Sequence, residues 1–205
     1  GTSSRISYTN PDKTIYRVYP YTTKLPALTK NDGIKAFCED QNGWWWLGTE
    51  SDGLIHYNPA TGDMANYRFP KKGVFIKTLR LVGRRVFIGC EAGCFSFDPQ
   101  TKIFTQLELP PEVTKDTPEI IDFELQSDSV LWLAGGGRYV LKYDLLRHTF
   151  KSFDVVKEVE VEKLKRYLPR ITIDLKKEIW VSLGRGGLLK FSETLQRFIP
   201  IKSRE

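Results

Sequence analysis

The chain has 205 residues, of which 40% are hydrophobic and 13% aromatic, so it is not a disordered segment and can form a domain with its own core. Its formal net charge is +6, but the basic pairs are scattered and no nucleic-acid-binding motif accompanies them, so we expect no nucleic-acid partner. No apolar run approaches the roughly 18 residues of a membrane helix, so we expect membrane contact only through other parts of a longer protein.

The first predicted element covers residues 5–19. Its sequence SYTNPDKTIYRV parallels HYNPATGDMANY, which lies further along the chain. In both segments an aromatic residue precedes an Asn-Pro turn, and a second β-forming residue follows ten positions after the first: Tyr8 and Val18, then Tyr57 and Tyr67. We predict two strands joined by a turn, equivalent to the second half of a longer unit.

Four longer units follow and repeat one pattern, which is the first feature to establish in any sequence. They cover residues 34–69, 76–109, 120–155 and 170–202. The aromatic residues of the second predicted strand align as Trp46, Phe87, Trp132 and Trp180. The small residues two positions later are Gly48, Gly89, Ala134 and Ser182. The aromatic residues of the third predicted strand are Tyr57, Phe97, Tyr143 and Phe191. Turn-forming residues separate these columns, so each unit is predicted to contain four short strands.

The second strands of these units are apolar without alternation, as in VFIG, VLWLAG and IWVSL. A strand with this pattern has both faces buried, as in the stacked blades of a β-propeller. The period of the repeat is also typical of a propeller. We therefore predict an all-β protein, residues 1–205, with four full four-stranded blades and a partial N-terminal blade at 5–19. A repeating β-sandwich is less favoured, because its strands should alternate polar and apolar residues.

The last link between units, residues 156–169, is longer than the others. It alternates Val and Glu at positions 159–162 and ends in the basic residues Lys163, Lys165 and Arg166. A projecting hairpin and a helical turn both remain open for this segment.

Residues suited to catalysis are scarce. The histidines His56 and His148 lie in a third strand and in a turn, away from a candidate nucleophile, so we expect no enzyme activity in this chain. Cys90 and Cys94 could face each other across a hairpin, but their spacing does not fix that geometry, and with Cys38 they are expected to be structural thiols. We expect no metal site and no cofactor.

The first full unit resembles the two-component regulator propeller repeat. The resemblance rests on Glu39-Asp40, Gly43, Trp46-Leu47-Gly48-Thr49, Gly53-Leu54 and Tyr57-Asn58-Pro59. It weakens in later units, where Arg80-Leu81 replaces the acidic pair and Tyr139 replaces the glycine before the third strand. This family implies the periplasmic sensor region of a hybrid two-component system of the Bacteroidetes type. Such a region would sense an oligosaccharide without converting it.

The loops between second and third strands, together with the loops between blades, form the expected ligand-binding face of such a propeller, because scaffolded loops carry much of the binding in proteins. Charged residues at matching positions in these loops are Glu50, Asp52, Glu91, Arg138 and Arg185. Arg138 and Arg185 could each hold a carboxylate or sulfate group through paired hydrogen bonds, which would suit an acidic glycan. Solvated loop charge is the competing interpretation. A protein-interaction scaffold, or part of a propeller lyase or hydrolase, remains an alternative function.

The strand count also predicts that the blades form an open arc and do not close into a complete propeller. The chain starts with the third and fourth strands of one blade and ends with the fourth strand of another. We therefore expect a fragment of a larger propeller, whose remaining blades would be its partners. Apolar end faces should promote self-association of the isolated chain or leave residues 1–30 poorly ordered.

Overall fold

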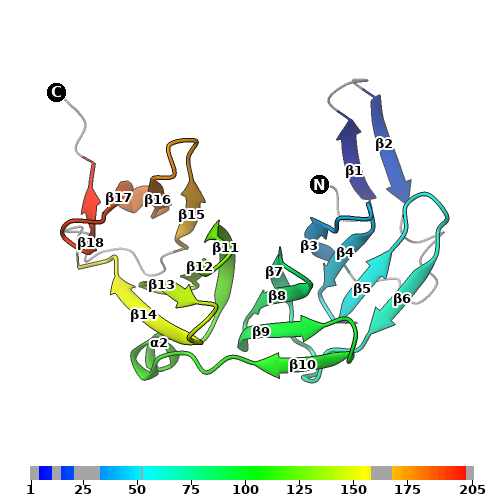
Figure 1. The fold of residues 1–205 in the computed structure, drawn as a ribbon, viewed down its shortest axis with the longest axis horizontal. Coiled ribbons are helices and arrows are strands. Elements are labelled where there is room, and N and C mark those ends of the chain that lie inside the picture. The colour runs from blue at the N-terminus through cyan, green and yellow to red at the C-terminus, as the bar shows by residue number, and fades with distance from the viewer. Residues whose placement is uncertain (1–4, 11–14, 21–32, 52, 158–167, 202–205) are drawn as a thin grey trace. The chain divides into compact units, whose positions relative to one another are not determined.

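The computed structural model describes residues 5–10, 15–20, 33–51, 53–157 and 168–201 (Figure 1). For the two N-terminal strands and for Arg185 it describes the backbone alone. The N-terminal strands are β1 (Arg5–Asn10) and β2 (Ile15–Pro20), and they pair antiparallel with Tyr8 opposite Arg17. The predicted hairpin in residues 5–19 is therefore present.

Four sheets of four strands each follow, and each sheet contains four consecutive strands. The first contains β3 (Ile34–Glu39), β4 (Trp45–Thr49), β5 (Leu54–Tyr57) and β6 (Met64–Tyr67). The second contains β7 (Ile76–Val82), β8 (Arg85–Cys90), β9 (Gly93–Asp98) and β10 (Ile103–Gln106). The third contains β11 (Ile120–Ser127), β12 (Val130–Gly135), β13 (Tyr139–Asp144) and β14 (Thr149–Asp154). The fourth contains β15 (Arg170–Ile173), β16 (Ile179–Ser182), β17 (Leu188–Ser192) and β18 (Arg197–Pro200).

The prediction of four four-stranded antiparallel blades is confirmed by these sheets. In the described residues, two short helices lie in the connections: α2 (Pro111–Asp116) before β11 and the 3-10 turn η1 (Gly184–Gly186) before β17. The sequence did not predict α2, which begins directly after Pro110, with Pro111 in its first turn. Proline is favourable in that position because the first helical N–H groups have no helical partner.

The chain divides into two compact units, with the boundary between Ile76 and Lys77 at the start of β7. In the first unit, Trp45, Leu47, Ile55 and Tyr57 form a buried cluster on one face of the β3–β6 sheet. Both Trp45 and Trp46 are buried.

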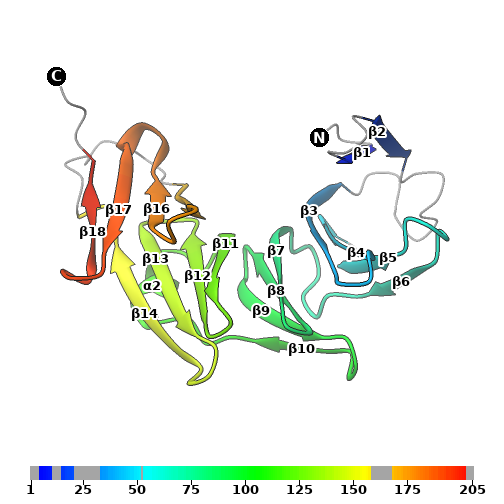
Figure 2. The same ribbon diagram turned by 45° about the horizontal axis from the view of Figure 1, so that its top comes forward.

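In the second unit the three sheets pack face to face, with β11 contacting both β8 and β15 (Figure 2). Trp132 is fully buried between the last two sheets, and its ring centroid lies 5.0 Å from that of Phe191. Close approach explains the column of small residues. A Cβ added at Gly89 would lie 2.8 Å from the carbonyl oxygen of Ile120 on the next sheet. Burial of these faces supplies most of the driving force for folding.

The equivalence of the four second-strand aromatics has one exception. Trp46, Phe87 and Trp132 are buried, but Trp180 is only half-buried. Its neighbours Ile179 and Val181 pack into the core shared with the β11–β14 sheet. Because side chains alternate along a strand, Trp180 points to the other face of its own sheet.

A candidate ligand-binding edge

The predicted ligand residues lie where the second strand of each sheet turns into the third. We call this side of the sheets the ligand edge. It comprises the β4–β5, β8–β9, β12–β13 and β16–β17 connections, and it is described separately in the two units.

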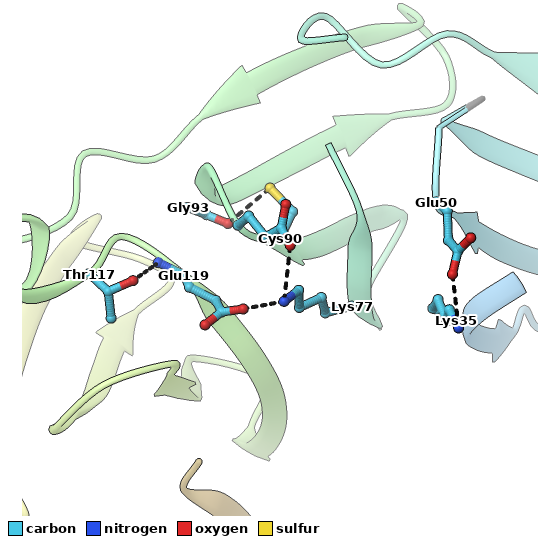
Figure 3. A network of polar contacts seen from close by, with 8 residues as sticks. Lys35, Glu50, Lys77, Cys90, Gly93, Thr117 and Glu119 are labelled. Carbon is cyan, nitrogen blue, oxygen red and sulfur yellow. Dashed lines mark hydrogen bonds and ion pairs between the residues drawn. The ribbon is translucent and has the colours of Figure 1, made fainter. Parts of the chain in front are cut away.

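Glu50 marks the ligand edge of the first unit. Its Oε1 atom accepts a hydrogen bond from Nζ of Lys35 at 2.9 Å (Figure 3). Its backbone N–H donates to the carbonyl of Gly33 at 3.0 Å. The hydrogen bond from Lys35 holds the pKa of Glu50 below its usual value, although partial burial opposes this. Asp52, also predicted as a ligand residue, lies outside the described residues.

Lys77 organises the ligand edge of the second unit. Its Nζ atom forms an ion pair with Glu119 and lies 3.3 Å from Oε1 of Glu91 (Figure 3). The side chain of Glu119 is only 9% exposed, so its charge requires this partner. Burial by itself would lower the pKa of Lys77, but the hydrogen bonds and charges of the two glutamates outweigh it and raise the pKa.

The same lysine–glutamate arrangement occurs in both units. Lys35 and Lys77 are each the second residue of a first strand, directly after an isoleucine. Glu50 and Glu91 each follow directly after a second strand. Sequence reasoning selected the glutamates and missed the lysines, although the repeated Ile-Lys pair was visible. Both predicted glutamates are therefore held by a lysine of their own sheet.

Arg138 lies in the β12–β13 connection, directly before β13, and belongs to a second polar group. Its Nη2 atom lies 2.8 Å from Oδ2 of Asp154, and its backbone N–H donates to Oδ2 of Asp116 at 3.0 Å. The hydrogen bond to Asp154 raises the pKa of Arg138 further. Its Nε atom is buried and has no hydrogen-bond partner among the residues the structure describes. A ligand anion would have to share this guanidinium with Asp154.

Two of the three glycines before Arg138, Gly136 and Gly137, fit closely against acidic side chains. A Cβ added at Gly136 would overlap the carboxylate of Glu119, and one added at Gly137 would overlap that of Asp116. The backbone N–H of Gly136 donates to the carbonyl of Glu119 at 2.7 Å. The glycines therefore allow the α2–β11 connection to approach the β12–β13 turn. Arg185 lies within η1, and its side chain is outside the described part of the structure.

Both histidines have structural contacts at the opposite edge of the sheets. His56 stacks on Trp46 with ring centroids 3.9 Å apart, and its Nε2 atom lies 2.9 Å from Oδ2 of Asp40. Nδ1 of His148 lies 3.0 Å from the hydroxyl of Tyr143. Among the described residues, no group of three or more His, Cys, Asp or Glu side chains could hold a metal ion.

The cysteines do not form a disulfide, and the register explains why. Cys94 pairs with Gly89 and Cys90 pairs with Gly93, so neighbouring positions place the two thiols on opposite faces of the sheet. None of the three cysteines is in a disulfide, and Cys90 and Cys94 are buried. Burial raises the pKa of the Cys94 thiol well above its ordinary value, which keeps it protonated at neutral pH.

Within the described ranges no helix is long and apolar enough to cross a membrane.

Comparison with known proteins identifies the fold. No protein-family model and no curated protein matches the chain. Among solved structures, it is similar to virginiamycin B lyase from Staphylococcus aureus, with a TM-score of 0.72 and 14% identity over 98% of this chain and 64% of that one. It is also similar to the extracellular domain of BT3049 from B. thetaiotaomicron, which is assigned to the hybrid two-component systems. There the TM-score is 0.53 and the identity 16%, over 80% of this chain and 29% of that one.

The chain thus spans less than two thirds of either structure. At these identities the likeness concerns the fold and leaves function open. The sheets, their order and these similarities establish that this chain has the β-propeller fold.

Proposed function

We propose that this chain is the non-catalytic, ligand-sensing segment of an extracytoplasmic sensor that belongs to a two-component system. The observation that carries the proposal is the repeat itself. Its acidic turn, second-strand tryptophan and Tyr-Asn-Pro turn resemble the two-component regulator propeller repeat. The similarity to the extracellular domain of BT3049 agrees with this role and with a periplasmic location.

The proposed ligand is an oligosaccharide bound at the ligand edge. The contacts proposed in the first unit are Glu50 and Asp52, and those proposed in the second unit are Glu91, Arg138 and Arg185. Arg138 and Arg185 would contact acidic groups of the glycan. The surroundings of Arg138 restrict this, because Asp154 already occupies one side of the guanidinium and Asp116 lies beside its backbone. An acidic group must therefore approach the side of Arg138 that faces away from Asp154.

Direct binding of oligosaccharides to the purified chain tests the proposal. Neutral and sulfated or uronic-acid-containing oligosaccharides are titrated by calorimetry at two salt concentrations. We expect binding of an acidic member that weakens as salt is added, because exposed ionic contacts are screened. Arg138→Ala combined with Arg185→Ala should weaken it by about tenfold. Arg147→Ala is the matched control, since this arginine is 82% exposed in a turn at the opposite edge. Equal affinity of the double variant and the unchanged chain would reject these contacts.

A lyase is the second candidate, favoured by the similarity to virginiamycin B lyase. It predicts that an added substrate is converted, whereas a sensor returns its ligand unchanged. Chromatography of each oligosaccharide after incubation with the chain separates the two. Turnover that a single substitution abolishes would replace the sensor proposal. A scaffold would bind protein and none of the oligosaccharides.

A further inference from the structure

In three of the four sheets, a histidine or lysine side chain lies over the ring of the aromatic residue in the second strand. In each sheet the aromatic residue pairs with a third-strand residue on the same face. His56 pairs with Trp46 and stacks on its ring. Lys142 and Lys190 pair with Trp132 and Trp180, and each places its Nζ atom 5.4 Å from the centre of the ring. An imidazole or an ammonium group therefore covers each of these three tryptophans.

The second sheet lacks this cover. There the aromatic is Phe87, and the residue paired with it is Ser96, which in turn pairs with Thr105 on β10. These two short side chains cannot extend over the phenyl ring. In the other three sheets a lysine or histidine fills the space over the ring. In this sheet the residue at that position is Ser96, which leaves the space unfilled.

A groove of about 790 Å³ lies at this position, between the β7–β10 and β11–β14 sheets of the second unit. Phe87, Ser96 and Thr105 line one side, while Tyr143 and Phe150 line the other. Figure 2 shows the two sheets side by side, in agreement with the contacts between β8 and β11. A space of this size suits a small molecule, and its aromatic walls provide large contact surfaces. Its lining includes Gly83 and His148 from turns at the edge opposite the ligand edge, and none of the connections that define the ligand edge.

The charges around the groove favour a cation. Arg85 lines it, but Nη2 of Arg85 lies 3.4 Å from Oδ2 of Asp98, which offsets its charge. Glu108 and Asp128 also line the groove, and both are exposed. The groove walls thus carry two carboxylates against one arginine that is already paired, which disfavours an anion, whereas an ammonium group would be attracted by this negative charge and by the π-faces of Phe87 and Tyr143.

We propose that this groove binds a small organic cation, namely an ammonium group attached to an apolar or ring-shaped body. The ammonium group lies over Phe87, in the position that Nζ of Lys142 occupies over Trp132 and Nζ of Lys190 occupies over Trp180. The body lies against Phe87, Tyr143 and Phe150. This site is separate from the ligand edge and goes beyond the proposed sensing of an oligosaccharide.

The test uses the full chain and three probes that share a phenyl ring. These are 2-phenylethylammonium, neutral 2-phenylethanol and anionic phenylacetate, titrated by NMR with the ring signals of Phe87 and Tyr143 as the readout. We expect the ammonium probe to bind about tenfold more tightly than the alcohol, and phenylacetate to bind more weakly still. Equal affinity for all three would overturn the proposal, because the groove would then be a general apolar site.

Variants of Ser96 give a sharper test. Ser96→Lys restores the cover found in the sister sheets and should weaken binding of 2-phenylethylammonium at least about tenfold, whereas Ser96→Ala should keep the groove and the affinity. Unchanged binding to a folded Ser96→Lys variant would overturn the proposal. If that variant does not fold, Glu108→Lys combined with Asp128→Lys reverses the charge at the rim and must weaken binding. Asp63→Lys, an exposed position in the first unit, is its control.

Discussion

Asp122 connects two neighbouring sheets through one half-buried carboxylate. Its Oδ2 atom accepts a hydrogen bond from the backbone N–H of Ile171 at 3.1 Å, and its Oδ1 atom accepts one from Phe123. Burial raises the pKa of Asp122 above its ordinary value, because the hydrogen bonds and the nearby charges of Arg170 and Arg80 only partly offset the loss of water. The folded protein therefore holds this proton more tightly than the unfolded chain.

A pH dependence follows from that difference. A raised pKa in the folded state contributes stability below the ordinary aspartate value, and this contribution is lost as the pH rises through the folded-state pKa. Asp122→Asn keeps an oxygen acceptor but never ionises. The free energy of unfolding of Asp122→Asn, relative to the unchanged chain, should therefore increase as the pH rises from about 3 to 7.

Urea unfolding at several pH values measures this difference. Asp128→Asn, at an exposed turn, should show no comparable trend. A constant or falling difference between Asp122→Asn and the unchanged chain would mean that the half-buried carboxylate is better stabilised than its surroundings indicate.

The turn between the third and fourth strands has one geometry in all four sheets. Each turn begins at a polar residue whose side chain accepts a backbone hydrogen bond, and the residue four positions later has a positive φ. These residues are Gly62, Lys102, His148 and Gln196. The opening residues that accept backbone hydrogen bonds through their side chains are Asn58, Asp98, Asp144 and Ser192. Only the first sheet uses glycine at the strained position, so the other three sheets bear a steric cost.

Lys102→Gly should relieve this cost in the second sheet. Lys102 has a φ of 59°, a conformation that glycine adopts without a Cβ clash. We expect the variant to be more stable by roughly 0.5–1 kcal/mol, after allowing for the extra entropy of glycine in the unfolded chain. Thermal or urea unfolding measures the change.

Two controls accompany this substitution. Lys102→Ala keeps a Cβ and should give no gain. His148→Gly should gain less than Lys102→Gly, because it also loses the hydrogen bond to Tyr143. A less stable Lys102→Gly variant would show that the lysine side chain contributes more than the turn costs.

The sequence predicted the strands well and the polar contacts poorly. Aligned aromatics such as Trp132 and Phe191 identified the sheets, because burial of a large ring imposes the same residue type at every equivalent position. The Lys77–Glu119 pair joins residues 42 positions apart and depends on how adjacent sheets pack. Such pairing leaves no periodic pattern within a unit. For the same reason the separation of Cys90 and Cys94 required the actual register of β8 and β9.

At the scale of the molecule, the face of the β15–β18 sheet that points away from the β11–β14 sheet carries exposed apolar side chains. Trp180 is half-buried there, while Leu188 is 43% exposed and Ile201 is 48% exposed. Exposed apolar patches of this kind mark interaction sites. We therefore expect the isolated chain to self-associate through this face.

Leu188→Lys tests that expectation. A charge in the middle of the face should shift the equilibrium toward the monomer, because a lysine cannot be buried there without a partner. Light scattering over a range of protein concentrations gives the mass. Leu146→Lys, at a turn residue that is 77% exposed on another sheet, should leave the mass unchanged. A chain that is monomeric at every concentration would contradict this role for the face.

The consecutive order of the strands also bears on how the protein acquires its fold during synthesis. Every strand pairs with the one before or after it along the chain, so each sheet needs only one short stretch of polypeptide to form. Folding rates rise as contacts become more local in sequence. Each sheet can therefore form soon after the ribosome releases its last strand, and in the second unit each new sheet then covers a face that its predecessor had left in water. The most vulnerable interval for aggregation is the delay between neighbouring sheets. Slow translation through residues 107–119 or 155–169 would lengthen it.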